Sequence, residues 1–222
     1  MNEPDYIAQK ITESITIDGN INKEIWQHAT WSKRFVDMVS GEAGMYNTQT
    51  ALLWNNTHLY IAFTAEEPFV EAKLTDRDSL IFLENDLEVF IDGGDCYYEL
   101  EVNALNTVYE VFFIWKDAYT KGSKYDTPQF DVHHPLTYTF GGNFDRSDTT
   151  FWKGTHSRGI RWAFTHYDMP GLQTAVMVEG TLNDNSNIDK GWNVEIAIPW
   201  VSLELLSNGR SLPPSHGDVW NM

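Results

Sequence analysis

The chain has 222 residues, a formal net charge of −17 and an aromatic content of 14%. This length suits one domain with a full core, and the negative charge argues against nucleic acid or an anionic membrane surface as partner, because both would repel it. No apolar run is long enough to cross a bilayer, so membrane insertion is not expected. The polar start of the chain is not a signal peptide, and the single cysteine, Cys96, cannot form an internal disulfide.

Short alternating runs separated by turn residues follow one another along the chain. The predicted strands, in chain order, cover residues 15–17, 48–54, 58–65, 85–92, 95–103, 107–115, 137–140, 160–164, 173–182 and 192–198. Asn22 is expected to cap one helical turn, and residues 201–206 one or two more. Many short strands joined mostly by tight turns predict an all-β fold. We expect a β-sandwich of two mainly antiparallel sheets with long loops and one or two short helices, forming a single domain over residues 1–222.

The stretch over residues 84–113 organises the predicted fold. Two alternating runs meet at Gly93-Gly94, a pair suited to a tight turn because both central positions need positive φ. One face of this hairpin is apolar and is expected to be core: Leu87, Val89, Ile91, Tyr98, Leu100 and Val102. The other face carries acids and aromatics: Asp86, Glu88, Phe90, Tyr97, Glu99, Glu101 and Asn103.

A turn at the two glycines would place Glu88 opposite Glu99 and Asp86 opposite Glu101. Like charges directly opposite each other destabilise a strand pair. A cation, nearby basic side chains or the polar groups of a ligand would offset this repulsion. The alternative is a solvated outer face with no ligand.

The connection over residues 116–171 is long for a compact domain, which is typical of a functional or a disordered segment. Aromatic rings with a few placed polar groups are typical of a ligand pocket. Rings available near or within this connection are Phe82, Trp115, Trp152 and Trp162. Trp115 and Trp162 sit in strand-like runs and can equally be core, whereas Trp152 is a candidate for an exposed ring.

A second candidate site is the polar loop over residues 183–189. Asp184, Asn187 and Asp189 offer closely spaced hard oxygens, the ligand type that calcium takes. The spacing is not that of an EF-hand loop, and an Asn/Asp-rich turn is the structural alternative. The acidic face of the hairpin is a rival location for calcium.

The ordered set of motifs resembles the family 9 carbohydrate-binding modules, which are β-sandwich sugar-binding domains. The motifs are Ile17-Asp18-Gly19 with Trp26, Ala51-Leu52-Leu53-Trp54, Asn85-Asp86-Leu87-Glu88-Val89-Phe90-Ile91-Asp92, Tyr98-Glu99-Leu100-Glu101-Val102-Asn103, Gly191-Trp192-Asn193-Val194-Glu195 and Gly217-Asp218-Val219-Trp220. They cover nearly the whole chain in the family's order. The resemblance implies a non-catalytic module that binds a carbohydrate.

The same resemblance implies site residues. Glu88 and Asn103 match hydrogen-bonding positions of the family, and Glu101 falls where well-known members have an arginine. Phe82 lies near one ring of the family's aromatic clamp, and Trp152 is a further candidate ring. The second clamp ring would lie beyond Trp220, so the chain is expected to lack the family's last strands.

The resemblance also implies a biological setting. Members serve polysaccharide breakdown or uptake, often beside a linked glycoside hydrolase domain in bacteria, and often carry structural calcium. An extracellular, periplasmic or cell-surface location follows. Catalysis by the chain itself is not expected, because no nucleophile motif, P-loop or dinucleotide fingerprint is present.

Two alternatives remain open at this point. Related sandwiches hold haem between axial side chains, and Met38, Met45, Met169 and Met177 are available as ligands. The chain could also be a degenerate structural domain of a glycoside hydrolase.

Overall fold

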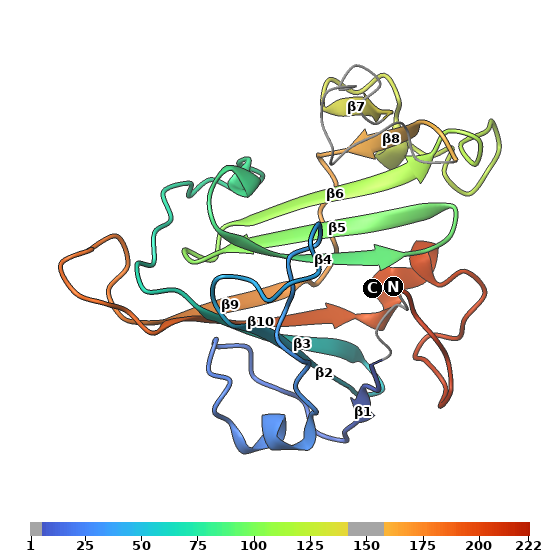
Figure 1. The fold of residues 1–222 in the computed structure, drawn as a ribbon. Coiled ribbons are helices and arrows are strands. Elements are labelled where there is room, and N and C mark those ends of the chain that lie inside the picture. The colour runs from blue at the N-terminus through green and yellow to red at the C-terminus, as the bar shows by residue number, and fades with distance from the viewer. Residues whose placement is uncertain (1–5, 142–157) are drawn as a thin grey trace.

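The structure is a computed structural model that describes residues 6–141 and 158–222, and within these ranges the strands form two layered sheets (Figure 1). The first sheet has the strand order β1-β2-β3-β10-β9. Its strands are Gln9–Lys10 (β1), Thr48–Trp54 (β2), His58–Glu66 (β3), Gln173–Glu179 (β9) and Gly191–Pro199 (β10). β1 pairs parallel with β2, and the other pairs are antiparallel.

The second sheet has the strand order β4-β5-β6-β8-β7 and is antiparallel throughout. Its strands are Asp86–Asp92 (β4), Cys96–Asn103 (β5), Val108–Trp115 (β6), Thr137–Phe140 (β7) and Arg161–Phe164 (β8). The all-β sandwich predicted from the sequence is confirmed.

Short 3-10 helices connect the strands. They are Glu24–His28 (η1), Ile81–Leu83 (η2), Pro128–Phe130 (η3) and Trp200–Leu206 (η4). The cap predicted at Asn22 is wrong: Lys23 holds that position and makes no side-chain capping bond. The strand predicted over residues 15–17 is also absent. Ile15 instead packs from an irregular segment onto the outer face of the first sheet.

The main core fills the space between the two sheets. Strands alternate their side chains between faces, so every second residue of β3 and β10 meets every second residue of β4 and β5. All six apolar residues predicted for the inner face of the hairpin are at most 8% exposed. Burial of each large apolar side chain contributes roughly 1.5–3 kcal/mol. This packing fixes which residues of β4 and β5 point outward.

The turn between β4 and β5 lies one residue later than predicted. Gly93 still belongs to the ladder, because its N–H donates to the Cys96 carbonyl at 2.8 Å, and Gly94 takes the positive φ of 76°. A Cβ on Gly93 would lie 2.8 Å from the Leu206 Cα of η4, so this position requires glycine for close packing. The two glycines therefore serve different purposes, and the register shifts by two residues.

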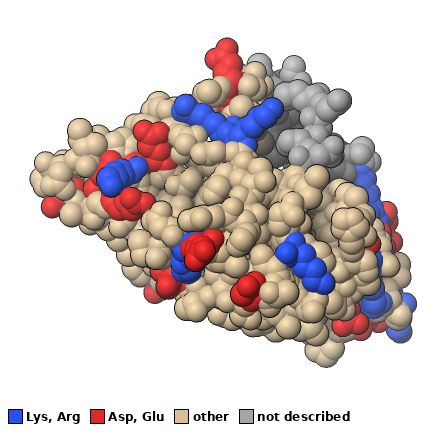
Figure 2. Space-filling model, turned by 90° about the horizontal axis from the view of Figure 1, so that it is seen from below, with Lys and Arg blue, Asp and Glu red and all other residues tan. Residues whose placement is uncertain are grey.

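The charge of the chain is spread thinly over the face of the molecule seen from below. Figure 2 shows Lys and Arg side chains beside or between Asp and Glu side chains, with uncharged surface separating them. No large patch of one sign is visible among the described residues in this view. The net charge of −17 therefore does not turn this face into an electrostatic binding surface.

Candidate functional site

The outer face of β4 and β5 gathers carboxylates from both strands. The observed register pairs Glu88 with Glu101, Asp86 with Asn103 and Phe90 with Glu99. This differs from the predicted pairing, but a shift of two residues keeps every side chain on its face because the strand period is two. The acidic outer face predicted from the sequence is therefore present, with different neighbours opposite each other.

Three of these carboxylates form a tight group. One oxygen each from Asp86, Glu88 and Glu101 lie within 4.8 Å of one another. Glu101 is only 1% exposed, whereas Glu88 reaches the surface. Asp86 Oδ2 and Glu101 Oε2 are buried and have no hydrogen-bond partner. We call Asp86, Glu88 and Glu101 the acidic cluster.

Burial and mutual repulsion raise the pKa of these groups. Burial raises the pKa of Glu101 to about 10, and the negative charges of Asp86 and Glu99 add to the shift. Burial, followed by the charge of Glu88, raises the pKa of Asp86 to about 6. Burial raises the pKa of Glu99 to about 7 and also raises that of Glu88. The acidic cluster thus lacks a compensating positive charge.

Aromatic rings continue the same outer face beside the acidic cluster. Phe90 is 41% exposed and lies 6.5 Å from the ring of Tyr97, which stacks on Phe113 at 4.4 Å. Arg161 donates from Nε to the Tyr97 hydroxyl at 2.5 Å, and its guanidinium lies 4.6 Å from the ring centre of Phe140. Cation–π contacts of this kind orient both partners. The face therefore offers flat apolar surface directly next to carboxylates.

Phe82 lies near the acidic cluster. It lies in η2, is 47% exposed and packs edge-on against Tyr109 at 5.7 Å between ring centres. Tyr109 pairs with Glu101 across β5 and β6. A second exposed ring thus lies near the carboxylates, through Tyr109. Trp152, the other predicted ring, lies outside the described residues.

Asn103 has a structural position. It is fully buried, and its Nδ2 donates to the Leu74 carbonyl at 3.0 Å and to Glu84 Oε1 at 2.8 Å. Its Oδ1 accepts from the backbone N–H groups of Leu105 and Thr107. All of its polar groups are therefore used to anchor the segment before β4, and the hydroxyl contact predicted for Asn103 has no free group in this arrangement.

The loop predicted to bind metal is held by internal hydrogen bonds. Asp189 Oδ1 accepts from Thr181 N–H at 2.8 Å, and its Oδ2 accepts from Val70 N–H at 3.0 Å. Asp184 Oδ1 accepts from Ser186 N–H, and Asn187 Nδ2 donates to Thr181 Oγ1. These contacts make Asp189 a loop anchor, so the Asn/Asp-rich turn accounts for this sequence.

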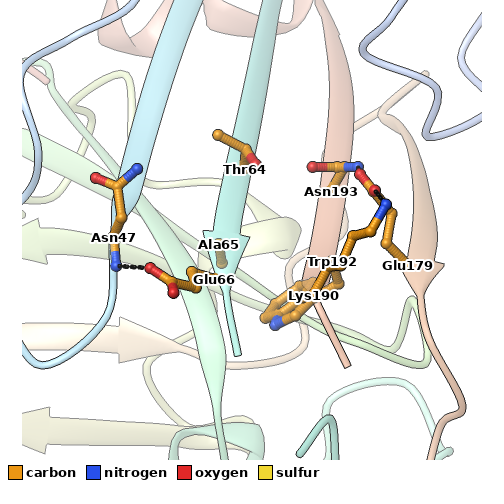
Figure 3. Close-up of a pocket in the computed structure, with 9 residues that line it drawn as sticks. Asn47, Thr64, Ala65, Glu66, Glu179, Lys190, Trp192 and Asn193 are labelled. Carbon is orange, nitrogen blue, oxygen red and sulfur yellow. Dashed lines mark hydrogen bonds and ion pairs between the residues drawn. The ribbon is translucent and has the colours of Figure 1, made fainter. Parts of the chain in front are cut away.

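A cavity of about 180 Å³ crosses the ends of the strands in the first sheet (Figure 3). Its carboxylates already have donors: Glu66 Oε2 accepts from Asn47 N–H at 3.1 Å, and Glu179 Oε1 accepts from Asn193 Nδ2 at 2.8 Å. These acids therefore hold neighbouring strands together and leave little free bonding capacity for a ligand.

A larger cavity of about 440 Å³ lies beside β4 and is bordered by residues 35–37 and 44–46. Two of its acids are engaged. Glu67 accepts from Asn85 Nδ2 at 2.6 Å and from Trp192 Nε1 at 2.8 Å, and Glu84 accepts from Lys73 N–H at 2.9 Å. Asp86 of the acidic cluster also lines this cavity, and its buried Oδ2 lacks a donor.

The sequence placed Glu88, Glu99, Glu101 and Phe90 on this face and named Phe82 near it, but it did not indicate Arg161 or Phe140. Glu99 and Phe90 belong to it by simple alternation along β4 and β5. Arg161 and Phe140 come from strands within the long connection, and no local motif marks them. Their place follows only from the pairing of β8 with β6 and β7.

The chain matches no family model and no curated protein. Among solved structures it is similar to a candidate carbohydrate-binding protein from Bacteroides uniformis, with a TM-score of 0.49 and 10% identity, over 88% of this chain and 72% of that one. It is also similar to a family 9 carbohydrate-binding module from Caldicellulosiruptor kristjanssonii in complex with cellotriose, with a TM-score of 0.36 and 13% identity, over 86% and 83%. The same module in complex with glucose gives 0.36 and 14%, over 86% and 84%.

These similar structures are carbohydrate-binding proteins and include family 9 modules, the family that the sequence motifs resemble. Their sequence identities to this chain are low. The candidate sugar site is the outer face of the second sheet.

The remaining predictions concern haem and membranes. Met169 is buried in the main core, while Met38, Met45 and Met177 are exposed on separate segments. None of the helical segments in the described part of the chain has the length and apolar character needed to cross a bilayer.

Proposed function

We propose that this chain is a non-catalytic carbohydrate-binding module whose sugar site is the outer face of β4 and β5. The observation that carries the proposal is the placement of carboxylates without donors near exposed aromatic rings. A sugar hydroxyl supplies the donor that the buried oxygens of Asp86 and Glu101 lack, and hydrogen bonds to an ionised carboxylate are stronger than neutral ones. The rings of Phe82 and Phe90 supply flat apolar surface for the sugar's C–H groups.

The roles of the residues follow from their exposure. Glu88 is exposed and would meet the ligand first, while Glu101 lies deeper and directly opposite it. Phe82 and Phe90 would lie beside the sugar. Asn103 supports the site indirectly by anchoring residues 73–84 through Leu74 and Glu84.

The test is a binding screen followed by calorimetry on variants. A panel of mono- and oligosaccharides, including glucose and cellotriose, identifies the ligand. We expect Glu88→Ala to weaken its binding about 10- to 100-fold, because each hydrogen bond to a charged group contributes roughly 1.5–3 kcal/mol. Phe90→Ala should weaken binding as well. Glu24→Ala, an exposed acid in η1, serves as the control and should bind like the wild type.

Absence of binding to every glycan in the panel would contradict the proposal. Binding that is indifferent to both Glu88→Ala and Phe90→Ala would place the site elsewhere on the molecule.

The sequence resemblance supports a wider setting for this activity. A module of this kind would hold a linked glycoside hydrolase domain on its polysaccharide, at an extracellular, periplasmic or cell-surface location. Hydrolysis of insoluble polysaccharide by the full-length protein, with and without Glu88→Ala, tests that role. We expect Glu88→Ala to hydrolyse insoluble polysaccharide more slowly than the wild type and soluble substrate at the same rate.

A further inference from the structure

The acidic cluster differs from two fully buried carboxylates of the described chain, Glu110 and Glu195. Glu110 is fully buried and accepts from the Tyr98 hydroxyl, from Met169 N–H and from Arg77. Glu195 is fully buried and also has a full set of donors. Glu101 is 1% exposed, yet its Oε2 has no hydrogen-bond partner.

Glu101 lies in a group of acidic side chains. Its ligand atom lies within 4.8 Å of those of Asp86 and Glu88, and Asp86 Oδ2 is also buried without a partner. Among the described residues, no ion pair reaches any of these three carboxylates. A buried, unpaired carboxylate is costly, so a positive group from outside the chain would stabilise this arrangement.

We propose that Asp86, Glu88 and Glu101 form a binding site for a divalent cation, with calcium as the ion that fits. Two oxygens that each lie about 2.4 Å from one calcium ion are at most about 4.8 Å apart, and the three oxygens of this cluster lie within that limit of one another. Three carboxylates offer up to six oxygens, and calcium takes six to eight in flexible geometry. The exposed side of Glu88 leaves room for water or a ligand hydroxyl to complete the shell.

The cation would also alter the sugar site, and this consequence depends on the proposed function. An ion held by Glu88 and Glu101 occupies the carboxylates and presents a positive charge to the ligand. Sugar hydroxyls would then bind through their oxygens to the ion. Calcium would bind without sugar, but it would raise the affinity for sugar, and by thermodynamic linkage sugar would raise the affinity for calcium by the same factor.

The experiment measures calcium binding alone, on the full chain stripped with EDTA and free of sugar. Calorimetric titration with CaCl₂, together with terbium luminescence excited through the protein's aromatic rings, gives the affinity and number of sites. We expect one site in the wild type and at least a roughly 10-fold weaker affinity in Glu88→Gln and Glu101→Gln, because even an outer-shell partner of a metal is worth about 10- to 100-fold. The exposed Glu88 makes E88Q the deciding variant if E101Q does not fold.

Two further variants locate the ion. Glu24→Gln should bind calcium as the wild type does. Asp184→Asn tests the polar loop over residues 183–189, and unchanged affinity there supports the hairpin site. No calcium binding at millimolar concentration, or binding that is lost in D184N and retained in E88Q, would overturn the proposal. A glycan titration in EDTA separates the two proposals, because sugar binding that survives chelation supports the module but removes the cation's part in it.

Discussion

Glu101 and Glu195 occupy equivalent places in the two sheets but have opposite surroundings. Both lie on inner strands and face away from the main core, and both are almost fully buried. Glu195 accepts from Gly19 N–H at 2.9 Å, from Lys23 Nζ at 2.7 Å and from Trp26 Nε1 at 2.7 Å. Glu101 accepts from no donor through Oε2 and faces other acids.

Glu195 stabilises the fold through its donors, whereas Glu101 has an unsatisfied oxygen that a ligand can bind. Glu195 ties the N-terminal segment to the outer face of the first sheet, where Trp26 and Ile15 complete a second apolar cluster. Glu101 is surrounded by other acids, and its Oε2 has no hydrogen-bond partner among the described residues. A buried carboxylate therefore indicates a ligand site only when its own fold does not already satisfy it.

The largest effect should come from removing Glu195. Glu195→Ala leaves the Trp26 indole N–H and the backbone N–H groups of Asp18 and Gly19 without their acceptor, and it removes the buried partner of Lys23, which keeps only Asp18 and a backbone carbonyl. Breaking a buried ion pair in this way costs about 3–5 kcal/mol. Chemical denaturation should show this loss of unfolding free energy. A loss below 1 kcal/mol would mean that the N-terminal segment is not held as the structure shows.

A smaller loss should follow from Asn103→Ala. The variant removes four hydrogen bonds made by a fully buried amide, and unsatisfied buried groups cost roughly 1–3 kcal/mol each, so we expect a net loss of about 2–3 kcal/mol. Asn187→Ala, an exposed amide, is the matched control and should change stability little. Unchanged stability of the Asn103 variant would contradict its role as an anchor.

Glu101→Gln should not lower the free energy of unfolding, in contrast to Glu195→Ala. In EDTA the variant removes the cost of protonating a carboxyl whose pKa burial raises to about 10 in the folded chain, so the free energy of unfolding at neutral pH should stay the same or rise by up to about 1 kcal/mol. Thermal and chemical denaturation check this. A loss of several kcal/mol would show that Glu101 supports the fold as Glu195 does.

The smallest effect concerns the thiol reactivity of Cys96, which lies on the inner side of the same hairpin. Burial raises the pKa of its thiol to about 11, and its Sγ contacts the Leu205 carbonyl at 3.3 Å. The raised pKa keeps the thiol protonated up to about pH 10, so thiol reagents at pH 8 should label it only after unfolding. Rapid labelling of the native protein would show that η4 does not cover this side of the hairpin.

Much of this arrangement follows from the sequence because the strand period is two. Leu100 and Glu101 must face opposite sides, and this remained true although the register shifted by two residues. The shift itself was not predictable from local sequence. It depends on Gly93, whose missing Cβ makes room for the Leu206 backbone far along the chain.

The polar residues were harder to assign because their partners are distant. Asn103 and Asp189 both look like ligand groups in the sequence, yet each is satisfied by segments remote in the chain, at Leu74 and Val70 for instance. The reverse holds for Glu101, whose lack of a donor is visible only once every neighbour is placed. Donor and acceptor satisfaction is a property of the whole fold.

The most direct test of the central claim is amide NMR of the labelled protein, titrated with the glycan that binds in the screen. Backbone signals of Glu88, Phe90, Glu99 and Glu101 should shift in proportion to occupancy, while those of Gly19 and Trp26 around Glu195 stay in place. Shifts confined to Glu66 and Glu179 at the cavity of the first sheet, or no shifts with any glycan, would contradict the assignment of the outer face of β4 and β5 as the sugar site.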